Sequence, residues 1–140
     1  MILVKILFYF RNNCNLKILG LILIKMELNV LGKPLLLCCK NPVTGFFRDG
    51  NCRTNSQDYG THTICAIIDN EFLDYTFKKG NDLITPRPDL KFPGLRSGDK
   101  WCLCALRWLE AERQGKAPKV VIESTHIKTL DYIDLKTLLK

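Results

Sequence analysis

The sequence predicts an α+β fold. In it, a small mixed or antiparallel sheet packs against a main helix near residues 98–114, with long loops rich in proline and glycine. Residues 61–68 (THTICAII) are rich in β-branched side chains and predict a buried strand. Residues 97–115 place apolar side chains, Trp101 and Trp108 among them, at helical spacing. Strand and helix signals are interspersed and the strands are few, which favours the α+β class.

The first part of the domain is dominated by turn signals. Residues 29–37 form a first segment, and residues 41–45 (NPVTG) are typical of a turn. Residues 46–47 (FF) predict a short strand that leads into Asp49-Gly50. This pair favours a tight turn because glycine accepts a positive φ at little cost.

The central part predicts one helix and one long loop. Asp69 or Asn70 can cap a helix that ends at residues 77–79, and Gly80 supplies the C-terminal stop. Residues 81–98 contain three prolines, which exclude a regular helix or a central strand. A loop of this length in a compact domain is often functional, although its apolar side chains can also serve to cover the core.

The last part predicts the main helix and four shorter elements. Ser97 or Asp99 can cap the main helix, and Gly115 ends it. The shorter elements are a β-type run at 119–123, a turn or short helix from 124, a brief strand at 132–133 and a helix capped by Asp134.

Residues 1–25 differ in composition from the rest of the chain. Of these, 20 of 25 are Ile, Leu, Lys, Asn, Phe or Tyr, whose codons are rich in A and T. We therefore expect a mis-assigned start ahead of Met26, or a disordered extension, with a signal-like segment or a genuine first element as alternatives. The uninterrupted apolar run at 18–24 is too short to span a bilayer. Residues 26–140 are expected to form a single globular domain.

The charge of the chain is concentrated in this extension. The formal net charge is +7, but residues 1–25 contain four basic residues and no acid. Residues 26–140 therefore carry 17 basic and 14 acidic residues, a net charge of +3. So small an excess on a mixed surface does not favour binding to a phosphate backbone. We expect neither a nucleic-acid partner nor a membrane partner, and the oligomeric state stays open.

The cysteine count is high, but its interpretation depends on the compartment. One of the seven cysteines, Cys14, lies in the extension, and no small-x-small cleavage site follows the apolar run. We therefore expect a cytoplasmic protein whose cysteines are reduced thiols, several of them buried. The other six are Cys38, Cys39, Cys52, Cys65, Cys102 and Cys104.

A zinc or redox-thiol protein is one alternative, with His62, Cys65, Cys102 and Cys104 as ligands. The predicted elements argue against this set. Positions 62 and 65 of a strand point to opposite faces, and positions 102 and 104 of a helix lie about 200° apart. We therefore predict no cofactor, and zinc remains the alternative.

A cysteine nucleophile is a second possibility, and whether the protein is an enzyme stays open. Cys52, Cys65 or Cys102 paired with His62 would supply a nucleophile and a base. The candidates for catalysis are Cys52, His62 and Cys65, with Asp49, Asp58 or Asp82 to orient the imidazole.

Our first hypothesis is a loop-built site for a small polar or anionic molecule. Arginine suits a carboxylate or phosphate, and neighbouring aromatic side chains suit a flat substrate. The alternative is a structural or protein-interaction module, in which the same polar residues only hold the loops. Common nucleotide-binding, hydrolase and zinc-protease motifs are absent from the sequence. The expected ligand-binding residues are Arg48, Asp49, His62, Asn81, Asp82 and Arg87.

Several long motifs occur in order: TGFFRDG, GTHTICA, GNDL with TPRP, FPGLRSGDKWCLCALRW and APKVVIESTH. In these motifs, residues 29–139 resemble domain of unknown function 2237, a family of small, mostly bacterial proteins. The family carries no assigned activity, so the resemblance implies membership without a reaction. Cys39 departs from the family pattern, which has a single cysteine at positions 38–39. The family pattern falls on Arg48, Asp49, Gly50, Cys52, Asp58, His62, Cys65, Asn81, Asp82, Asp99, Trp101, Cys102, Cys104, Trp108 and His126.

Overall fold

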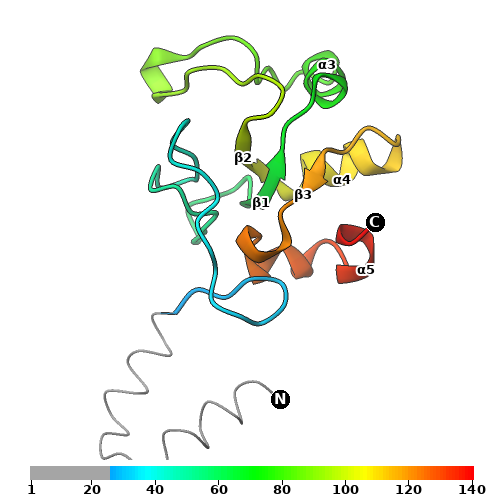
Figure 1. The fold of residues 1–140 in the computed structure, drawn as a ribbon. Helices are drawn as coiled ribbons and strands as arrows, with labels where there is room; N and C mark the ends of the chain where they lie inside the picture. Colours follow the sequence, from blue (N-terminus) through cyan, green and yellow to red (C-terminus); the bar gives the residue numbers. More distant parts are fainter. Residues whose placement is uncertain (1–25) are drawn as a thin grey trace, which may run out of the picture.

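Three strands form one antiparallel sheet in the computed structural model, which describes residues 26–140 (Figure 1). The central strand β1 (His62–Ile67) pairs with β2 (Lys100–Cys104) on one side and β3 (Lys119–Val120) on the other. Three helices complete the fold: α3 (Asn70–Lys78), α4 (Ala105–Arg113) and α5 (Leu135–Leu138). The α+β prediction is confirmed. The prediction for residues 1–25 lies outside the described residues.

The elements with strong local signals form as predicted. β1 occupies most of the predicted 61–68 strand, and its inner residues are buried on both faces. Asp69 caps α3 by accepting a hydrogen bond from the Phe72 amide at 2.7 Å, and Asp134 caps α5 in the same way. These caps form because a short carboxylate satisfies an amide that the first turn of a helix leaves free.

The main helix is shorter than the prediction, and this is a correction. Residues 100–104 form the edge strand β2, and α4 begins only at Ala105. The spacing of Trp101 and Trp108 fits a helix. However, residues 100–104 pair with β1, which is distant in the sequence, and this pairing decides the local structure. Cys102 and Cys104 therefore point to the same face of a strand.

Two further predicted strands do not form. Residues 46–47 lie in a turn, and residues 132–133 follow the 3₁₀ helix at Ile127–Asp131. In both places, the described residues provide no neighbouring strand to pair with. Two other 3₁₀ helices lie at Pro88–Leu90, in the long loop, and at Ile122–Ser124.

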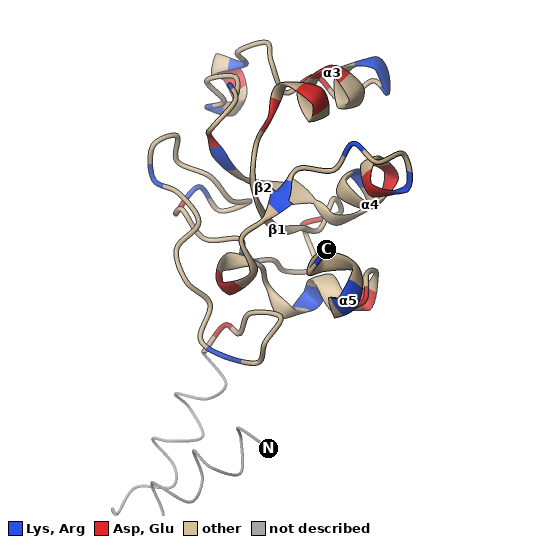
Figure 2. Cartoon of the chain, turned by 45° about the vertical axis from the view of Figure 1, so that its right-hand side comes forward, with Lys and Arg blue, Asp and Glu red and all other residues tan. Residues whose placement is uncertain are grey.

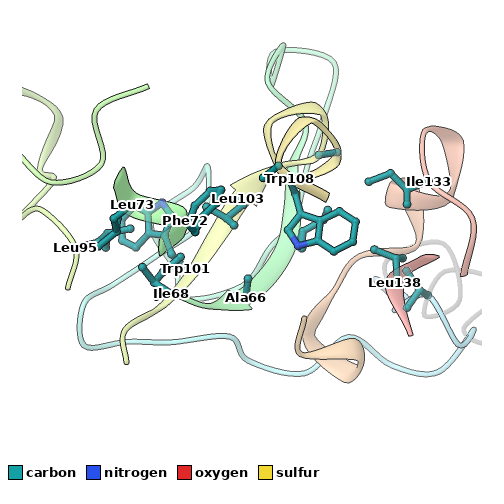
Figure 3. Packing of buried hydrophobic residues seen from close by; sticks show 14 of the residues in the cluster. Ala66, Ile68, Phe72, Leu73, Leu95, Trp101, Leu103, Trp108, Ile133 and Leu138 are labelled. Carbon is teal, nitrogen blue, oxygen red and sulfur yellow. The ribbon is translucent and has the colours of Figure 1, made fainter. Parts of the chain in front are cut away.

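The hydrophobic core extends along the sheet (Figure 3). Trp108 of α4 packs with Ile133 and Leu138 at one end, and Trp101 of β2 packs with Phe72 of α3 at the other. The indole nitrogen of Trp108 donates a hydrogen bond to the Pro118 carbonyl at 3.0 Å. Because β2 belongs to this core and is also an edge strand, it offers a rigid support for residues at its free side.

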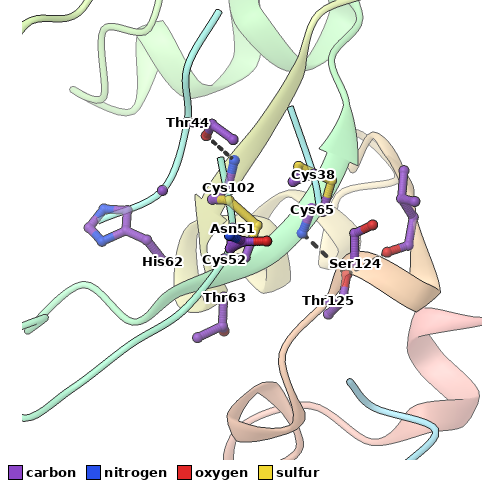
Figure 4. Close-up of a disulfide and its surroundings, with 12 residues drawn as sticks. Cys38, Thr44, Asn51, Cys52, His62, Thr63, Cys65, Cys102, Ser124 and Thr125 are labelled. Atoms are coloured by element: carbon purple, nitrogen blue, oxygen red, sulfur yellow. Dashed lines mark hydrogen bonds between the residues drawn. A yellow bond between two sulfur atoms is a disulfide. The ribbon is translucent and has the colours of Figure 1, made fainter. Parts of the chain in front are cut away.

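Four buried cysteines form a second, smaller cluster (Figure 4). Cys38 is bonded to Cys65 of β1, and Cys52 is bonded to Cys102 of β2. The prediction of reduced thiols is therefore wrong for these four. Each bond joins residues far apart in the sequence, so no local pattern indicates the pairing. Disulfides persist mainly in oxidising compartments, and the cytoplasmic location stays a prediction.

The disulfides attach the segment from Cys38 to Cys52 to the sheet, and buried hydroxyls complete the attachment. Thr44 accepts a hydrogen bond from the Cys102 amide at 2.8 Å, and Thr125 accepts one from the Cys65 amide at 3.2 Å (Figure 4). This segment has no helix or strand of its own. Its position therefore depends on these cross-connections.

The charged residues are distributed over the whole surface. Both α3 and α4 carry basic and acidic residues, α5 carries Lys136, and the view in Figure 2 shows no large area of one sign. Within residues 26–140, no helix has the length and apolar character needed to cross a membrane.

Candidate functional site

A cavity of about 480 Å³ lies at the free edge of β2. The turn at residues 45–48 and the loop at residues 81–92 border it, and β2 forms its base. Of the six expected ligand-binding residues, the structure brings five to this cavity, and only Asp49 lies outside. The lining residues are Gly45, Phe46, Arg48, His62, Asn81, Asp82, Leu83, Arg87, Leu90, Phe92, Trp101, Cys102, Leu103 and Cys104.

The turn at residues 45–48 has a backbone that only glycine permits at its first position. Gly45 has a φ of +97°, and a Cβ atom there would lie 2.3 Å from the Asn51 carbonyl oxygen. The Arg48 amide closes the turn by donating to the Gly45 carbonyl at 3.0 Å. Thr44 is buried and accepts a hydrogen bond from the Cys102 amide of β2, which fixes where the turn begins.

Arg48 is held at the cavity but has no acidic partner among residues 26–140. Its Nη1 donates to the Gly45 carbonyl at 2.7 Å, and its guanidinium lies 5.1 Å from the ring centroid of Trp101. Its Nε is buried without a hydrogen-bond partner. Burial lowers the pKa of the Arg48 guanidinium from its ordinary value. Such an unpaired donor favours an anion beside it.

Backbone strain is concentrated around the cavity. Within the described chain, three residues other than glycine have a positive φ: Arg48 (54°), Thr61 (49°) and Lys91 (52°). Arg48 lines the cavity, and the other two are direct neighbours of His62 and Phe92, which also line it. A positive φ disfavours residues with a Cβ atom, and such strain occurs preferentially at functional sites.

Asp49 has a structural role outside the cavity. Its carboxylate accepts a hydrogen bond from the Asn51 amide at 3.0 Å and pairs with Arg53 at 2.7 Å. Burial raises the pKa of Asp49, but the hydrogen bonds from Asn51 and Arg53 together outweigh it and hold the pKa below its ordinary value. The ligand-binding role predicted for Asp49 has no support in this geometry.

The polar residues of the opposite wall are engaged within their own loop. Asp82 accepts hydrogen bonds from the amides of Thr85 at 2.9 Å and Ile84 at 2.8 Å. The bonds from Thr85, and then the one from Ile84, lower the pKa of Asp82. Arg87 pairs with Asp89 at 2.7 Å on the surface. These residues line the cavity and also stabilise the loop, so the ligand-binding and structural roles both stay predictions for them.

An apolar floor lies beneath these charges. Trp101 and Phe92, both almost fully buried, contact edge to face with their ring centroids 5.3 Å apart. Leu83, Leu90 and Leu103 complete this apolar part of the lining. A ligand with a flat or apolar body would therefore find a complementary surface below Arg48.

His62 also lines the cavity, and its ring is held by Asp58. The Asp58 Oδ1 is 2.6 Å from Nδ1 of the imidazole, and the Asp58 side chain is 0% exposed. The second Asp58 oxygen accepts from the Thr54 hydroxyl at 3.0 Å and from the His62 amide at 2.8 Å. Figure 4 shows the imidazole to one side of the two disulfides.

The cysteines predicted for catalysis or metal binding are differently placed. Cys52 and Cys65, the catalytic candidates, are disulfide-bonded, as is Cys102 from the alternative zinc set. The sulfur atoms of Cys38, Cys52 and Cys102 lie within 4.8 Å of one another, and all three are in these bonds. Because Cys65 and Cys102 are disulfide-bonded, neither offers a thiolate to a metal. The absence of a cofactor and the zinc alternative both stay predictions.

Cys104 is the cysteine that the sequence reasoning placed wrongly. It keeps a free thiol, lines the cavity and occupies the position opposite His62 in the β1–β2 pairing. The predicted helix separated it from the face of Cys102. Recognising residues 100–104 as a strand would have placed it opposite β1.

A family model described as "Uncharacterized protein conserved in bacteria (DUF2237)" matches residues 28–140. This span includes every residue of the cavity, and it confirms the resemblance predicted for residues 29–139. No curated protein shows a significant match to the chain.

Proposed function

The chain belongs to the uncharacterised bacterial family DUF2237, and we propose that it binds a small anionic molecule in the cavity at the edge of β2. Arg48 would hold the negatively charged end, and the apolar body would lie over Trp101 and Phe92. The single observation that carries this proposal is the buried, unpaired Nε of Arg48.

The charge distribution supports Arg48 as the anchor. Arg87 is already neutralised by Asp89, and the carboxylate of Asp82 is engaged by two amides of its own loop. Of Arg48, Asp82 and Arg87, the charged residues of the lining, only Arg48 keeps a buried donor that has no hydrogen-bond partner. Guanidinium groups bind carboxylates and phosphates through two parallel hydrogen bonds, and they hold them more strongly in a partly buried site.

The size of the site sets the class of ligand. A volume of about 480 Å³ lies within the range of small-molecule sites. It suits one molecule with a single charged group and a compact body. The apolar floor favours a carboxylate carried on a ring over a bare inorganic ion.

Calorimetric titration of the full chain with benzoate, benzamide and inorganic phosphate tests this proposal. Benzoate should bind, benzamide of the same shape but without charge should not, and phosphate should bind more weakly because it lacks a ring. Arg48→Gln should weaken benzoate binding about tenfold or more, as expected for loss of a charge-assisted pair.

The matched control is Arg113→Gln, an exposed arginine at the end of α4 that does not line the cavity. It should leave benzoate binding unchanged. Equal affinity for benzoate and benzamide, or no effect of Arg48→Gln, would overturn the proposal in favour of a purely structural turn.

A further inference from the structure

We propose that Cys104 is a nucleophile in this cavity and that His62 is the base that takes its proton. The target would be an electrophilic carbon of an anionic substrate held by Arg48. This inference rests on the proposed function for the binding of the substrate, but its chemistry depends on a different set of residues: Cys104, His62 and Asp58.

The first support is the pairing of the two reacting residues. His62 and Cys104 are directly opposite in the antiparallel pair of β1 and β2, and both line the cavity. In a regular antiparallel pair, opposite residues have Cβ atoms about 4.5–5.5 Å apart and side chains on one face of the sheet. The register shifts between His62 and Ile64, so His62 pairs with Cys104 at the edge of this irregularity. No hydrogen bond joins the imidazole and the thiol in the described chain, and such pairs are often longer before a substrate binds.

The second support is the orientation of the imidazole. Asp58 accepts hydrogen bonds from the Thr54 hydroxyl and the His62 amide, and its Oδ1 lies 2.6 Å from Nδ1 of the ring. As a carboxylate it only accepts, so the hydrogen-bond pattern assigns the proton to Nδ1. Nε2 of the neutral ring then carries a lone pair that can accept a proton. Asp58 is a positioning residue in this arrangement, comparable to the third member of a nucleophile–base–carboxylate set.

The third support is the chemical state and position of Cys104. It is a free thiol beside a cluster in which four cysteines are consumed by disulfides. It is also the N-cap residue of α4, a helix of nine residues. This position places the thiol at the junction of β2 and α4, where the strand that carries Cys102 ends.

An acyl substrate makes the reaction explicit. The Cys104 sulfur forms a bond to the carbonyl carbon, and its proton passes to Nε2 of His62. The bond to the leaving group breaks, and the leaving group takes the proton from His62. Water then attacks the thioester and gives a proton to His62, and the carbon–sulfur bond breaks with return of that proton to the sulfur. The net reaction is hydrolysis of one acyl bond by one water.

Alkylation with a charged and a neutral reagent tests the inference directly. Iodoacetate carries a carboxylate, and iodoacetamide is its neutral counterpart. Each forms a sulfur–carbon bond and releases iodide, and the thiol proton passes through His62 to solvent. The rate at each cysteine of the full chain is read from peptide masses. Cys39, the other free cysteine of residues 26–140, is the internal control.

The expected results separate the roles of the residues. Cys104 should react faster than Cys39, and more so with iodoacetate. Arg48→Gln should reduce only the iodoacetate rate, by about tenfold. His62→Ala should reduce both Cys104 rates about a hundredfold, within the range for loss of a general base, and added imidazole should restore part of the rate. The Cys39 rates should not change.

Asp58→Asn should lower the Cys104 rate and shift the His62 proton from Nδ1 to Nε2, which ¹⁵N NMR of the imidazole detects. A loss of rate without that shift would overturn the positioning role. If the alkylation rate of Cys104 equals that of Cys39 and does not change in His62→Ala, the proposed nucleophile is overturned. Benzoate binding would be unaffected by that outcome. Alkylation of Cys104 that is fast and depends on His62, but is equally fast with both reagents, would retain the nucleophile. Together with equal affinity for benzoate and benzamide, it would overturn the anion site.

Discussion

The imidazole of His62 lies directly against Gly60. A Cβ atom on Gly60 would lie 2.4 Å from Cε1 of the ring, closer than real Cβ contacts come, and 3.0 Å from Nε2, a tight contact. Gly60 thus supports the ring from one side, while Asp58 holds Nδ1 by a hydrogen bond. The position of the ring therefore depends on the absence of a side chain two residues earlier.

Gly60→Ala should displace the imidazole and slow alkylation of Cys104, because the added methyl group occupies the space of the ring. Gly80→Ala is the matched control, since nothing lies within 4 Å of its Cβ position. Gly80 has a φ of +84°, so alanine there should cost about 1 kcal/mol of stability with no effect on Cys104. Unchanged reactivity in Gly60→Ala would contradict the contact.

Thr44→Val should destabilise the fold by about 1–3 kcal/mol, because it leaves the buried Cys102 amide without its acceptor. It should also weaken benzoate binding, since Thr44 fixes the start of the turn that carries Arg48. Urea unfolding measures the first effect and calorimetry the second. Thr44→Ser retains the hydroxyl and should preserve benzoate binding; a loss equal to that of valine would contradict the role of this bond.

Arg48→Gly should abolish benzoate binding and change the free energy of unfolding by less than about 1 kcal/mol. Glycine relieves a positive φ worth about 1–2 kcal/mol, which offsets the lost hydrogen bond and the contact with Trp101. Denaturant unfolding and titration of the same sample give both values. A large destabilisation would mean that Arg48 is mainly structural.

Reduction of the disulfides should destabilise the protein by about 3–4 kcal/mol for each bond, since the bonds close segments of 27 and 50 residues. Unfolding curves with and without a phosphine reductant measure the change. Peptide mapping of the unreduced protein should recover Cys38 linked to Cys65 and Cys52 linked to Cys102. Any other pairing would contradict the arrangement.

Asp82→Asn should destabilise the fold at pH 7, and the difference from the unmodified protein should shrink in acid. Hydrogen bonds from Thr85 and Ile84 lower the pKa of Asp82 in the folded state below its ordinary value of 3.8. Their stabilising contribution is therefore full above pH 3.8 and is lost as the pH falls through the lower, folded value. Urea unfolding at pH 7 and pH 3 tests this. Asp74→Asn, an exposed substitution on α3, should show no such trend.

The predictable part of the fold is the part with local causes. β1 follows from a run of β-branched residues, and the caps at Asp69 and Asp134 act within one helical turn. β2 was mistaken for the start of a helix because its pairing partner lies far away in the sequence. The disulfides were missed for the same reason, since no local pattern indicates which distant cysteines meet.

The candidate site shows the same division. Arg48 and Asp82 were grouped because they lie in loops rich in turn residues, with His62 of the predicted strand added to them, and all three line one cavity. Asp49 was grouped with them by proximity in sequence alone, and it pairs with Arg53 instead. Cys104 was named with His62 only as an alternative zinc ligand, because its position opposite His62 exists only once β1 and β2 pair.

The position of Trp101 beneath Arg48 makes the site its own optical probe. The chain has two tryptophans, and Trp108 lies outside the cavity, bonded to the Pro118 carbonyl. Trp108→Phe therefore leaves one emitting indole, 5.1 Å from the guanidinium that the anion would neutralise. Its emission would report occupancy of the cavity without a label, in a sample too dilute for calorimetry.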